Sequence, residues 1–340
     1  MAKADLLFLN NKAMEACGVL DMQEAIKDVE ATYVLTEKGD VILPGKLVTR
    51  WGTTPEDENR LGRINAMPGY IGGDYNMAGI KWIGSGPQNY KRGLPRASVP
   101  VILNDPDTKL PVCIADGTAV SAKRTGASGG IAARELSVRD AAVMLVCGAG
   151  AQARTQLEAI KLTRPTLRKV FVYDIRPEST AAFIKDMGPM YPDIEFVATD
   201  TPETGAREAD IIDCVTLADS PIIEAAWIKP GALLMNMADC EMTYDCVRKS
   251  SKIVVDNWEN VKHRMISTVA LMARDGLIKD EDIHAEMGQI LLGKKAPRET
   301  DDEIIYFNAV GSGLMDIAVV TRCYRKAQKQ GLGVLLPYWE

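Results

Sequence analysis

The sequence predicts an α/β protein in which a Rossmann-type, doubly wound parallel sheet domain is inserted into an α+β domain. Two observations lead to this fold class. Apolar segments of strand length alternate with helical segments between residues 143 and 255, and the first of them ends in a glycine turn. The residues before this region contain several short strands without that alternation. We therefore expect one domain at 126–313 and a second domain assembled from residues 1–125 and 314–340.

The amino-terminal part of the chain is expected to be rich in strands. Apolar residues recur at helical spacing over 22–37, and small residues fill a long helical stretch over 118–136. Turn signals such as Gly72-Gly73-Asp74 divide the remainder into short apolar segments. The expected strands are 5–9, 41–51, 63–68, 77–83, 99–104 and 112–115.

Beyond a linker at 137–140, the pattern becomes that of a parallel sheet with crossover helices. The chain then returns to the first domain through a helix at 314–330. The expected strands are 143–147, 169–173, 194–197, 210–215, 232–236 and 252–255, with helices at 152–162 and 178–187 and a further crossover segment at 202–209.

The glycine turn after strand 143–147 indicates a dinucleotide site. Gly148 and Gly150 allow a tight turn and a close approach of the backbone to a pyrophosphate, and Ala153 is small enough for the helix to pack on the strand. The exposed amides at the start of the helix would then meet the phosphate charge.

An acid follows the next strand at the position expected for ribose binding. Asp174 would accept hydrogen bonds from both ribose hydroxyls and repel a 2′-phosphate, so the sequence favours NAD over NADP. Arg176 is close enough to weaken that preference. The alternative is that Asp174 only caps the turn that follows it.

Composition excludes several classes of protein. The chain has 340 residues and a formal net charge of −6, which gives no general attraction to nucleic acid or to an anionic membrane. No apolar run reaches membrane-spanning length, and the amino terminus lacks the pattern of a signal peptide. Seven scattered cysteines without a CxxC pair suit a reducing compartment. We expect a cytoplasmic protein with no membrane or nucleic-acid partner.

The chain contains only two histidines, His263 and His284. This excludes a multi-histidine metal site, and we expect no metal. We interpret His263 as a solvated loop residue and His284 as structural. Acid–base chemistry is then expected from carboxylates, lysines or water.

Two cations of the first domain stand out from the solvated ones. Lys81 lies inside an apolar strand between Ile80 and Trp82, and an unpaired buried charge is costly, so it must reach an anion or a cavity. Arg124 has a similar character at the start of the small-residue helix. Together they suit a substrate carboxylate or a cofactor phosphate.

Motifs spread over nearly the whole chain resemble the ornithine cyclodeaminase/μ-crystallin family. That family implies a homodimer built through the first domain, NAD or NADP bound in the second, and an amino-acid or imino-acid substrate between them. The matching segments are Met67-Pro68, Gly79-Ile80-Lys81-Trp82-Ile83-Gly84, Asn104-Asp105-Pro106-Asp107-Thr108, Arg124-Thr125-Gly126-Ala127, Gly148-Ala149-Gly150-Ala151-Gln152-Ala153, and Val310-Gly311 followed by Asp316.

The resemblance also assigns roles to individual residues. Val310 and Gly311 would close over the nicotinamide, and Asp174 would bind the adenosine ribose. Substrate binding is implied for Arg50, Arg63, Met67, Lys81 and Gly311, and cofactor binding for Ser98, Arg124, Gly148, Gly150, Ala151, Gln152, Asp174, Val215, Thr216, Asn236 and Val310.

The acid–base residue is left open between two carboxylates. Cyclodeaminases of the family carry an aspartate in a Gly-Gly-Asp-x-Pro-Gly-Lys pattern, and here Asp239 takes that position by one alignment and Glu241 by another. The double glycine, the proline and the lysine are missing from this chain, which counts against a true cyclodeaminase. We take Asp239 as the candidate, with Lys81 as the second catalytic residue.

Within the family, further segments resemble a branch of dehydrogenases that oxidise a secondary amine at Cα. These segments include 63–68, 254–258, 284–286 and 301–305. The expected reaction is NAD-dependent oxidation of a multi-carboxylate secondary amine to an imine, which is hydrolysed to a 2-oxo acid and an amine. The alternatives are a cyclodeaminase that converts ornithine to proline and ammonia with catalytic NAD, and a non-catalytic NAD(P)-binding protein like the crystallins.

Overall fold

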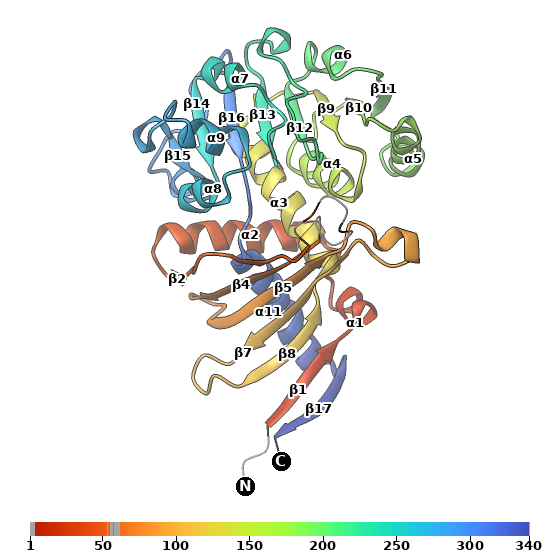
Figure 1. The fold of residues 1–340 in the computed structure, drawn as a ribbon, viewed down its shortest axis with the longest axis vertical. Helices are drawn as coiled ribbons and strands as arrows, with labels where there is room; N and C mark the ends of the chain where they lie inside the picture. The colour runs from red at the N-terminus through yellow and green to blue at the C-terminus, as the bar shows by residue number, and fades with distance from the viewer. Residues whose placement is uncertain (1–3, 53, 55–56, 58–61, 238, 340) are drawn as a thin grey trace. The chain divides into compact units, whose positions relative to one another are not determined.

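The structure is a computed structural model that describes residues 4–52, 54, 57, 62–237 and 239–339. The chain forms two compact units (Figure 1). Unit 1 consists of Met1–Arg124 and Ser312–Glu340, and unit 2 is Thr125–Gly311. The boundaries expected after residues 125 and 313 differ from these by one and two residues.

Unit 2 contains an eight-stranded sheet in which every strand pairing is parallel. The strand order is β11-β10-β9-β12-β13-β16-β14-β15, so the predicted Rossmann-type fold is confirmed. The strands are β9 (Val143–Cys147), β10 (Lys169–Tyr173), β11 (Glu195–Ala198), β12 (Ile211–Cys214), β13 (Leu233–Asn236), β14 (Lys252–Val255), β15 (Ala285–Glu286) and β16 (Ile305–Asn308).

The strand order reverses at β9, and this reversal predicts where a ligand would bind in unit 2. The chain adds β10 and β11 on one side of β9 and β12 and β13 on the other. In open parallel sheets, ligands bind beyond the carboxyl ends of the strands at such a switch point. The unit's longer helices are α4 (Ala151–Thr163) and α5 (Pro177–Met187), followed by the shorter α6 (Pro202–Ala206), α7 (Tyr244–Lys249), α8 (Trp258–Arg264), α9 (Thr268–Arg274) and α10 (Met287–Leu291).

Unit 1 is built on a mixed nine-stranded sheet. Its main path is β17-β1-β8-β7-β5-β4-β2, with β3 paired to β4 and β6 to β5. Among the strand pairings of its described residues, β1–β8 is parallel and the others are antiparallel. The strands are β1 (Ala4–Leu9), β2 (Val41–Ile42), β3 (Leu47–Thr49), β4 (Arg63–Ile71), β5 (Met77–Ser85), β6 (Ala97–Ser98), β7 (Pro100–Asn104), β8 (Pro111–Asp116) and β17 (Val334–Trp339).

The carboxy-terminal helix α11 (Gly313–Gln330) packs on this sheet and on α2 (Met22–Glu37) (Figure 1). Glycine in β5 makes the close packing possible. A Cβ at Gly79 would lie 2.5 Å from the carbonyl oxygen of Ile102 and 3.3 Å from the side chain of Ile317. Helix α3 (Thr118–Leu136) has the bounds that the sequence predicts, and the short α1 (Asn11–Ala16) follows β1.

Some expected elements differ from the structure. The single strand expected at 41–51 is divided into β2 and β3, because Pro44 lacks an N–H for a sheet hydrogen bond and Gly45 follows it. Helix α6 ends three residues before the expected end of its segment. Strands β6, β15, β16 and β17 are additional to the prediction.

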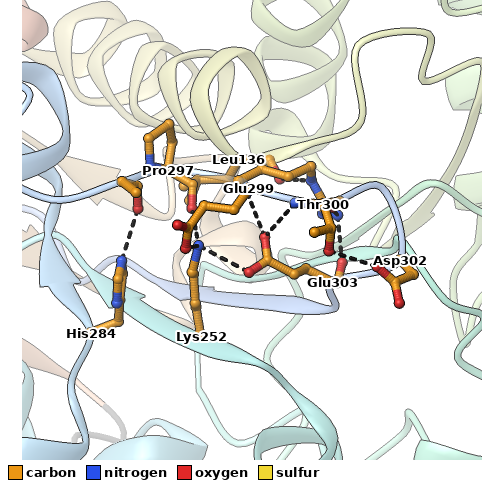
Figure 2. Close-up of polar contacts among 10 residues, drawn as sticks. Leu136, Lys252, His284, Pro297, Glu299, Thr300, Asp302 and Glu303 are labelled. Atoms are coloured by element: carbon orange, nitrogen blue, oxygen red, sulfur yellow. Dashed lines mark hydrogen bonds and ion pairs between the residues drawn. The ribbon is translucent and has the colours of Figure 1, made fainter.

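A buried lysine holds the segment 297–303 against the start of β14 (Figure 2). The Nζ of Lys252 donates to the carbonyl oxygen of Pro297 at 2.9 Å and lies 2.7 Å from Glu299 Oε2 and 3.0 Å from Glu303 Oε1. Two carboxylates satisfy one ammonium group, so this buried charge is structural. His284 Nε2 lies 2.8 Å from the carbonyl oxygen of Ala296, consistent with a structural role.

Within the described residues, the structure contains no helix that is both long and apolar enough to cross a membrane.

Candidate active site

In unit 1, Lys81 in the middle of β5 is buried. The Nζ of Lys81 lies 2.7 Å from Oδ1 of Asp316 and 2.8 Å from Oγ of Ser121. The side chains of Lys81 and Asp316 are 1% and 0% exposed. Asp316 lies in the first turn of α11, where a carboxylate also interacts favourably with the helix dipole.

Arg124 adds a second cation to the same carboxylate. Its Nε lies 3.3 Å from Oδ2 of Asp316, and its side chain is 11% exposed. Neither of these two atoms has a hydrogen-bond partner among the described residues. With Lys81 protonated, the cluster Lys81–Asp316–Arg124 therefore carries one net positive charge and retains unused hydrogen-bonding capacity.

Burial lowers the pKa of Lys81 to about 8. Asp316 opposes this shift by stabilising the ammonium form, and the positive charge of Arg124 adds to it. A lysine with a pKa near neutrality can hold an anion in its ammonium form or exchange a proton under physiological conditions.

Local packing fixes the position of Asp316. Met67 on β4 pairs directly with Lys81 on β5. A Cβ at Gly313, the first residue of α11, would lie 2.4 Å from the carbonyl oxygen of Met67. Only a glycine allows the helix to begin so close to the strand, and Asp316 follows one turn later.

The other predicted residues of unit 1 lie outside this cluster. Arg50 is exposed immediately after β3, and Ser98 is exposed on β6, where it pairs with Gly84. Arg63 is the first residue of β4. The structure thus brings together Lys81, Arg124 and Met67 of the predicted set.

In unit 2, the glycine turn has the geometry that the sequence predicts. Gly148 has a φ of +93°, and a Cβ there would lie 2.9 Å from the carbonyl oxygen of Val215. Gly150 begins α4 without a side-chain cap, so Ala151 and Gln152 start a helix whose first amides have no side-chain acceptor. The Oε1 atom of Gln152 is buried without a partner among the described residues.

Asp174 lies against this turn. Its Oδ2 accepts a hydrogen bond from the N–H of Ala149 at 2.9 Å, and its Oδ1 accepts one from the N–H of Arg176 at 2.9 Å. The structure is therefore compatible with both interpretations of Asp174, as a ribose-binding residue and as a turn cap. Its side chain caps the following turn and also borders the glycine turn. The guanidinium Nε of Arg176 is 3.7 Å from Asp174, and its side chain is 68% exposed.

Together, these features fit a dinucleotide. The uncapped start of α4 supplies free amides for a pyrophosphate, and Gly150 leaves open space where a Cβ would lie. Asp174 supplies a carboxylate beside the turn, as ribose recognition requires.

A buried carboxylate anchors the end of β12. Oε1 of Glu241 accepts hydrogen bonds from the N–H and Oγ1 of Thr216 at 3.1 and 3.0 Å, and its Oε2 accepts one from Nδ2 of Asn236 at 2.6 Å. Burial raises the pKa of Glu241, and the bonds from Thr216 partly offset that shift. Asn236 is fixed further by Tyr306, whose hydroxyl donates to its Oδ1 at 2.6 Å.

Asp239 differs from Glu241 in its surroundings. Its Oδ1 accepts a hydrogen bond from Nη2 of Arg264 at 2.9 Å, and its side chain is 26% exposed. A partly accessible carboxylate can exchange a proton with a bound molecule or a water, whereas both oxygens of Glu241 are occupied by protein donors. The geometry favours Asp239 over Glu241 as the acid–base candidate.

Three further aspartates have notable surroundings in the structure, although no role was predicted for them from the sequence. Asp256 accepts hydrogen bonds from the N–H groups of Val310 and Gly311 at 3.0 and 2.6 Å, which fixes this segment. Asp213 on β12 is fully buried, and neither of its oxygens has a hydrogen-bond partner among the described residues. Burial, together with the nearby charge of Glu241, raises the pKa of Asp213 well above its usual range. The sequence does contain a signal that Asp316 is a buried acid, because it lies within the apolar run Leu314-Met315-Asp316-Ile317.

The strand order of unit 2 and the turn at its switch point define the protein as one with a dinucleotide-binding domain. The family model "Ornithine cyclodeaminase/mu-crystallin family" matches residues 9–331. The chain belongs to this family, as its motifs predict.

Similar proteins agree with this assignment. N-((2S)-2-amino-2-carboxyethyl)-L-glutamate dehydrogenase of Staphylococcus aureus is 32% identical over 333 residues, covering 98% of each chain. This is the branch whose segments the sequence resembles. The structure of Thermococcus litoralis Δ1-pyrroline-2-carboxylate reductase in complex with NADH and L-proline has a TM-score of 0.87 at 31% identity, over 97% of this chain and 99% of that one. An archaeal alanine dehydrogenase dimer with bound NAD has a TM-score of 0.89 at 29% identity, over 98% and 100%. These relatives are dehydrogenases and reductases of amino and imino acids.

Proposed function

We propose that this protein is an NAD-dependent dehydrogenase that oxidises a multi-carboxylate secondary amine at Cα to an imine, which is hydrolysed to a 2-oxo acid and an amine. The substrate class is that of N-(2-amino-2-carboxyethyl)-L-glutamate. The similarity to the dehydrogenase of that name over 98% of both chains supports this choice.

The observation that carries the proposal is the net positive charge of the Lys81–Asp316–Arg124 cluster. Two cations share one carboxylate in a site almost closed to solvent, and a substrate carboxylate would complete the charge balance. Lys252 provides the contrast, because its two carboxylate partners leave no positive charge for an anionic ligand to neutralise. We assign Lys81 to the substrate carboxylate. We propose that Arg124, for which the family resemblance implies cofactor binding, contributes to the same carboxylate, with Arg50 and Arg63 as further candidates for a second carboxylate.

Most of the residues that would hold the cofactor lie in unit 2, and Ser98 of unit 1 is a further candidate. The amides of Ala151 and Gln152 would bind the pyrophosphate, and Asp174 the adenosine ribose. Val215 and Thr216 at the end of β12 and the segment Val310-Gly311 would line its other half. When bound, NAD would accept a hydride from the substrate Cα. The carboxylate of Asp174 would repel a 2′-phosphate, so we propose NAD rather than NADP.

The chain's own residues would position the substrate and move its protons. The ammonium group of Lys81 would hold a carboxylate, which orients the adjacent Cα. Asp239, or a water that it polarises, would take the proton from the substrate nitrogen and later activate water for hydrolysis. Glu241 would hold Thr216 and Asn236 in place without exchanging a proton itself.

We also propose a homodimer formed through unit 1. The related alanine dehydrogenase is a dimer, and the edge strand β17 of unit 1 exposes large apolar side chains, among them Leu335 at 67% and Trp339 at 63%. Exposed apolar strands at a sheet edge are typical of association surfaces. The seven cysteines, all free thiols, are consistent with a cytoplasmic location.

NADH absorbance with a panel of amino and imino acids tests the proposal. We expect NAD reduction with N-(2-amino-2-carboxyethyl)-L-glutamate and little with alanine or ornithine. Conversion of ornithine to proline without net NADH would instead identify a cyclodeaminase. Tight NAD binding without turnover of any compound would identify a non-catalytic binding protein. NADH oxidation with Δ1-pyrroline-2-carboxylate alone would point to a cyclic imine reductase.

A further inference from the structure

We propose that a basic pocket formed by α2 and the carboxy-terminal half of α11 in unit 1 binds a small multivalent anion of the oligophosphate or polycarboxylate class. The pocket has a volume of about 420 Å³, which is within the range of small-molecule sites. Five of its lining residues belong to α11 and one belongs to α2, and Figure 1 shows these two helices. Its lining residues are Asp28, Tyr75, Arg322, Arg325, Lys326, Lys329 and Gln330.

The pocket's cations all come from one face of α11. Arg322, Arg325, Lys326 and Lys329 follow each other at intervals of three, one and three residues, which places them along one side of a helix. Like charges at such spacing repel each other, so the arrangement lowers the stability of an isolated helix. A bound multivalent anion would remove that repulsion.

Among the described residues that line the pocket, one is a carboxylate, and it already has partners. Asp28 Oδ2 accepts a hydrogen bond from Nε of Arg322 at 2.7 Å, and its Oδ1 accepts one from the hydroxyl of Tyr75 at 2.8 Å. The Nη2 atom of Arg322 is buried and has no hydrogen-bond partner among the described residues. This ion-paired arginine therefore does not use its full hydrogen-bonding capacity within the protein.

The other three cations of the pocket have no carboxylate partner in the part of the chain that the structure describes. Arg325 donates to the carbonyl oxygens of Asp74 and Tyr75, which are neutral acceptors. Lys326 and Lys329 are exposed and form no ion pair with any part of the chain that the structure describes. Four cations and one carboxylate leave a local charge of about +3 on a protein whose net charge is −6.

An alternative explanation is that these cations only compensate the dipole at the end of α11. That role falls off within the last turn of a helix, where Lys329 lies, and it does not explain Arg322 two turns earlier. Four helical cations elsewhere in the chain lie beside an acid three or four residues away, at Lys27–Glu24, Arg207–Glu203, Arg248–Asp245 and Lys262–Glu259. Among the described residues, none of the four α11 cations has such a neighbour, and all four line the same pocket.

Calorimetric titration with inorganic tripolyphosphate at constant ionic strength tests the proposal. We expect the full-length protein to bind it and Lys326→Gln/Lys329→Gln to bind about tenfold more weakly, because two ligand-facing charges are lost. The charge-preserving Lys326→Arg/Lys329→Arg should retain the wild-type affinity. Lys185→Gln/Lys295→Gln is the matched control, since both lysines are exposed in unit 2.

Any tripolyphosphate bound at the glycine turn or at Lys81 is common to all four proteins, so the comparison does not depend on the proposed dehydrogenase activity. Equal affinity in the wild type and Lys326→Gln/Lys329→Gln would overturn the proposal. An equal loss in the control pair would also overturn it, because it would indicate general charge screening. A parallel titration with citrate distinguishes polycarboxylates from phosphates as the preferred anion.

Discussion

The ammonium nitrogen of Lys81 lies 2.7 Å from Oδ1 of Asp316, and neither side chain is accessible to solvent. The two residues are separated by 235 positions in the sequence and come from a central strand and the first turn of α11. With Arg124 beside the buried Lys81–Asp316 pair, two cations face one carboxylate, so the charges do not balance as they would in a purely structural salt bridge. This imbalance links the fold to the proposed anionic substrate.

Removal of Asp316 should destabilise the protein strongly. In Asp316→Asn, the cations of Lys81 and Arg124 lose the buried counterion that they share, and we expect a loss of about 3 kcal/mol or more in the free energy of unfolding. Urea denaturation measures this value. Asp239→Asn breaks a partly exposed ion pair and should cost about 1 kcal/mol or less. Equal effects of the two substitutions would contradict the role given to Asp316.

The pH dependence of substrate binding should follow Lys81. The pKa of Lys81 is lowered to about 8, chiefly by burial, so the ammonium form prevails below that pH and is lost as pH rises through it. We therefore expect KM for a carboxylate substrate to increase above about pH 8. Lys81→Arg retains its charge at higher pH and should remove this alkaline limb, even if kcat falls. An unchanged alkaline limb in Lys81→Arg would assign the titration to another group.

Cofactor preference should depend on Asp174. Asp174→Ser removes the carboxylate that would repel a 2′-phosphate, and we expect the ratio of kcat/KM for NADP to that for NAD to rise about tenfold or more. Part of any general loss would come from the hydrogen bond to Ala149, which both cofactors would share. The ratio isolates the specific effect. Arg176→Gln is the companion variant and should shift the ratio toward NAD.

The two acid–base candidates can be separated by their different environments. Asp239→Asn should lower kcat by about a hundredfold or more if Asp239 exchanges the proton, with little change in thermal stability. Glu241→Gln should lower stability and cofactor affinity, because Glu241 holds Thr216 and Asn236. Its pH–rate profile should keep the wild-type shape. A normal kcat in Asp239→Asn would reject Asp239 as the acid–base residue.

Sequence patterns were sufficient for the parts of the fold that depend on local chemistry. The alternation of apolar strands with helices predicts the parallel sheet, and the turn at Gly148 marks its switch point. Helix α3 follows from its run of small residues. In each case the signal lies within a few residues of the element it predicts.

Elements defined by distant contacts could not be predicted in the same way. Strand β17 contains Pro337 and exposes all six of its residues, so it lacks the apolar alternation of a half-buried strand. Strand β16 lies between β13 and β14 in the sheet but follows β14 and β15 in the sequence. Pairing across such separations carries no local signature.

In the candidate site, too, local features could be predicted from the sequence and distant contacts could not. The position of Lys81 in an apolar strand predicts a buried partner, but the sequence does not identify Asp316 as that partner. Likewise, the sequence leaves Asp239 and Glu241 as alternatives two residues apart. Their surroundings differ because Glu241 turns toward Thr216 and Asn236, whereas Asp239 meets Arg264.

The most direct test of the account is the stoichiometry of the reaction with N-(2-amino-2-carboxyethyl)-L-glutamate and NAD, measured for the wild type and Lys81→Met. The account predicts equal amounts of NADH and 2-oxoglutarate from the wild type. It also predicts a loss of about a hundredfold or more in kcat/KM in Lys81→Met, whose fold should be retained because Arg124 still balances the charge of Asp316. The absence of NADH formation from this substrate and from other multi-carboxylate amines, or full activity in Lys81→Met, would contradict it.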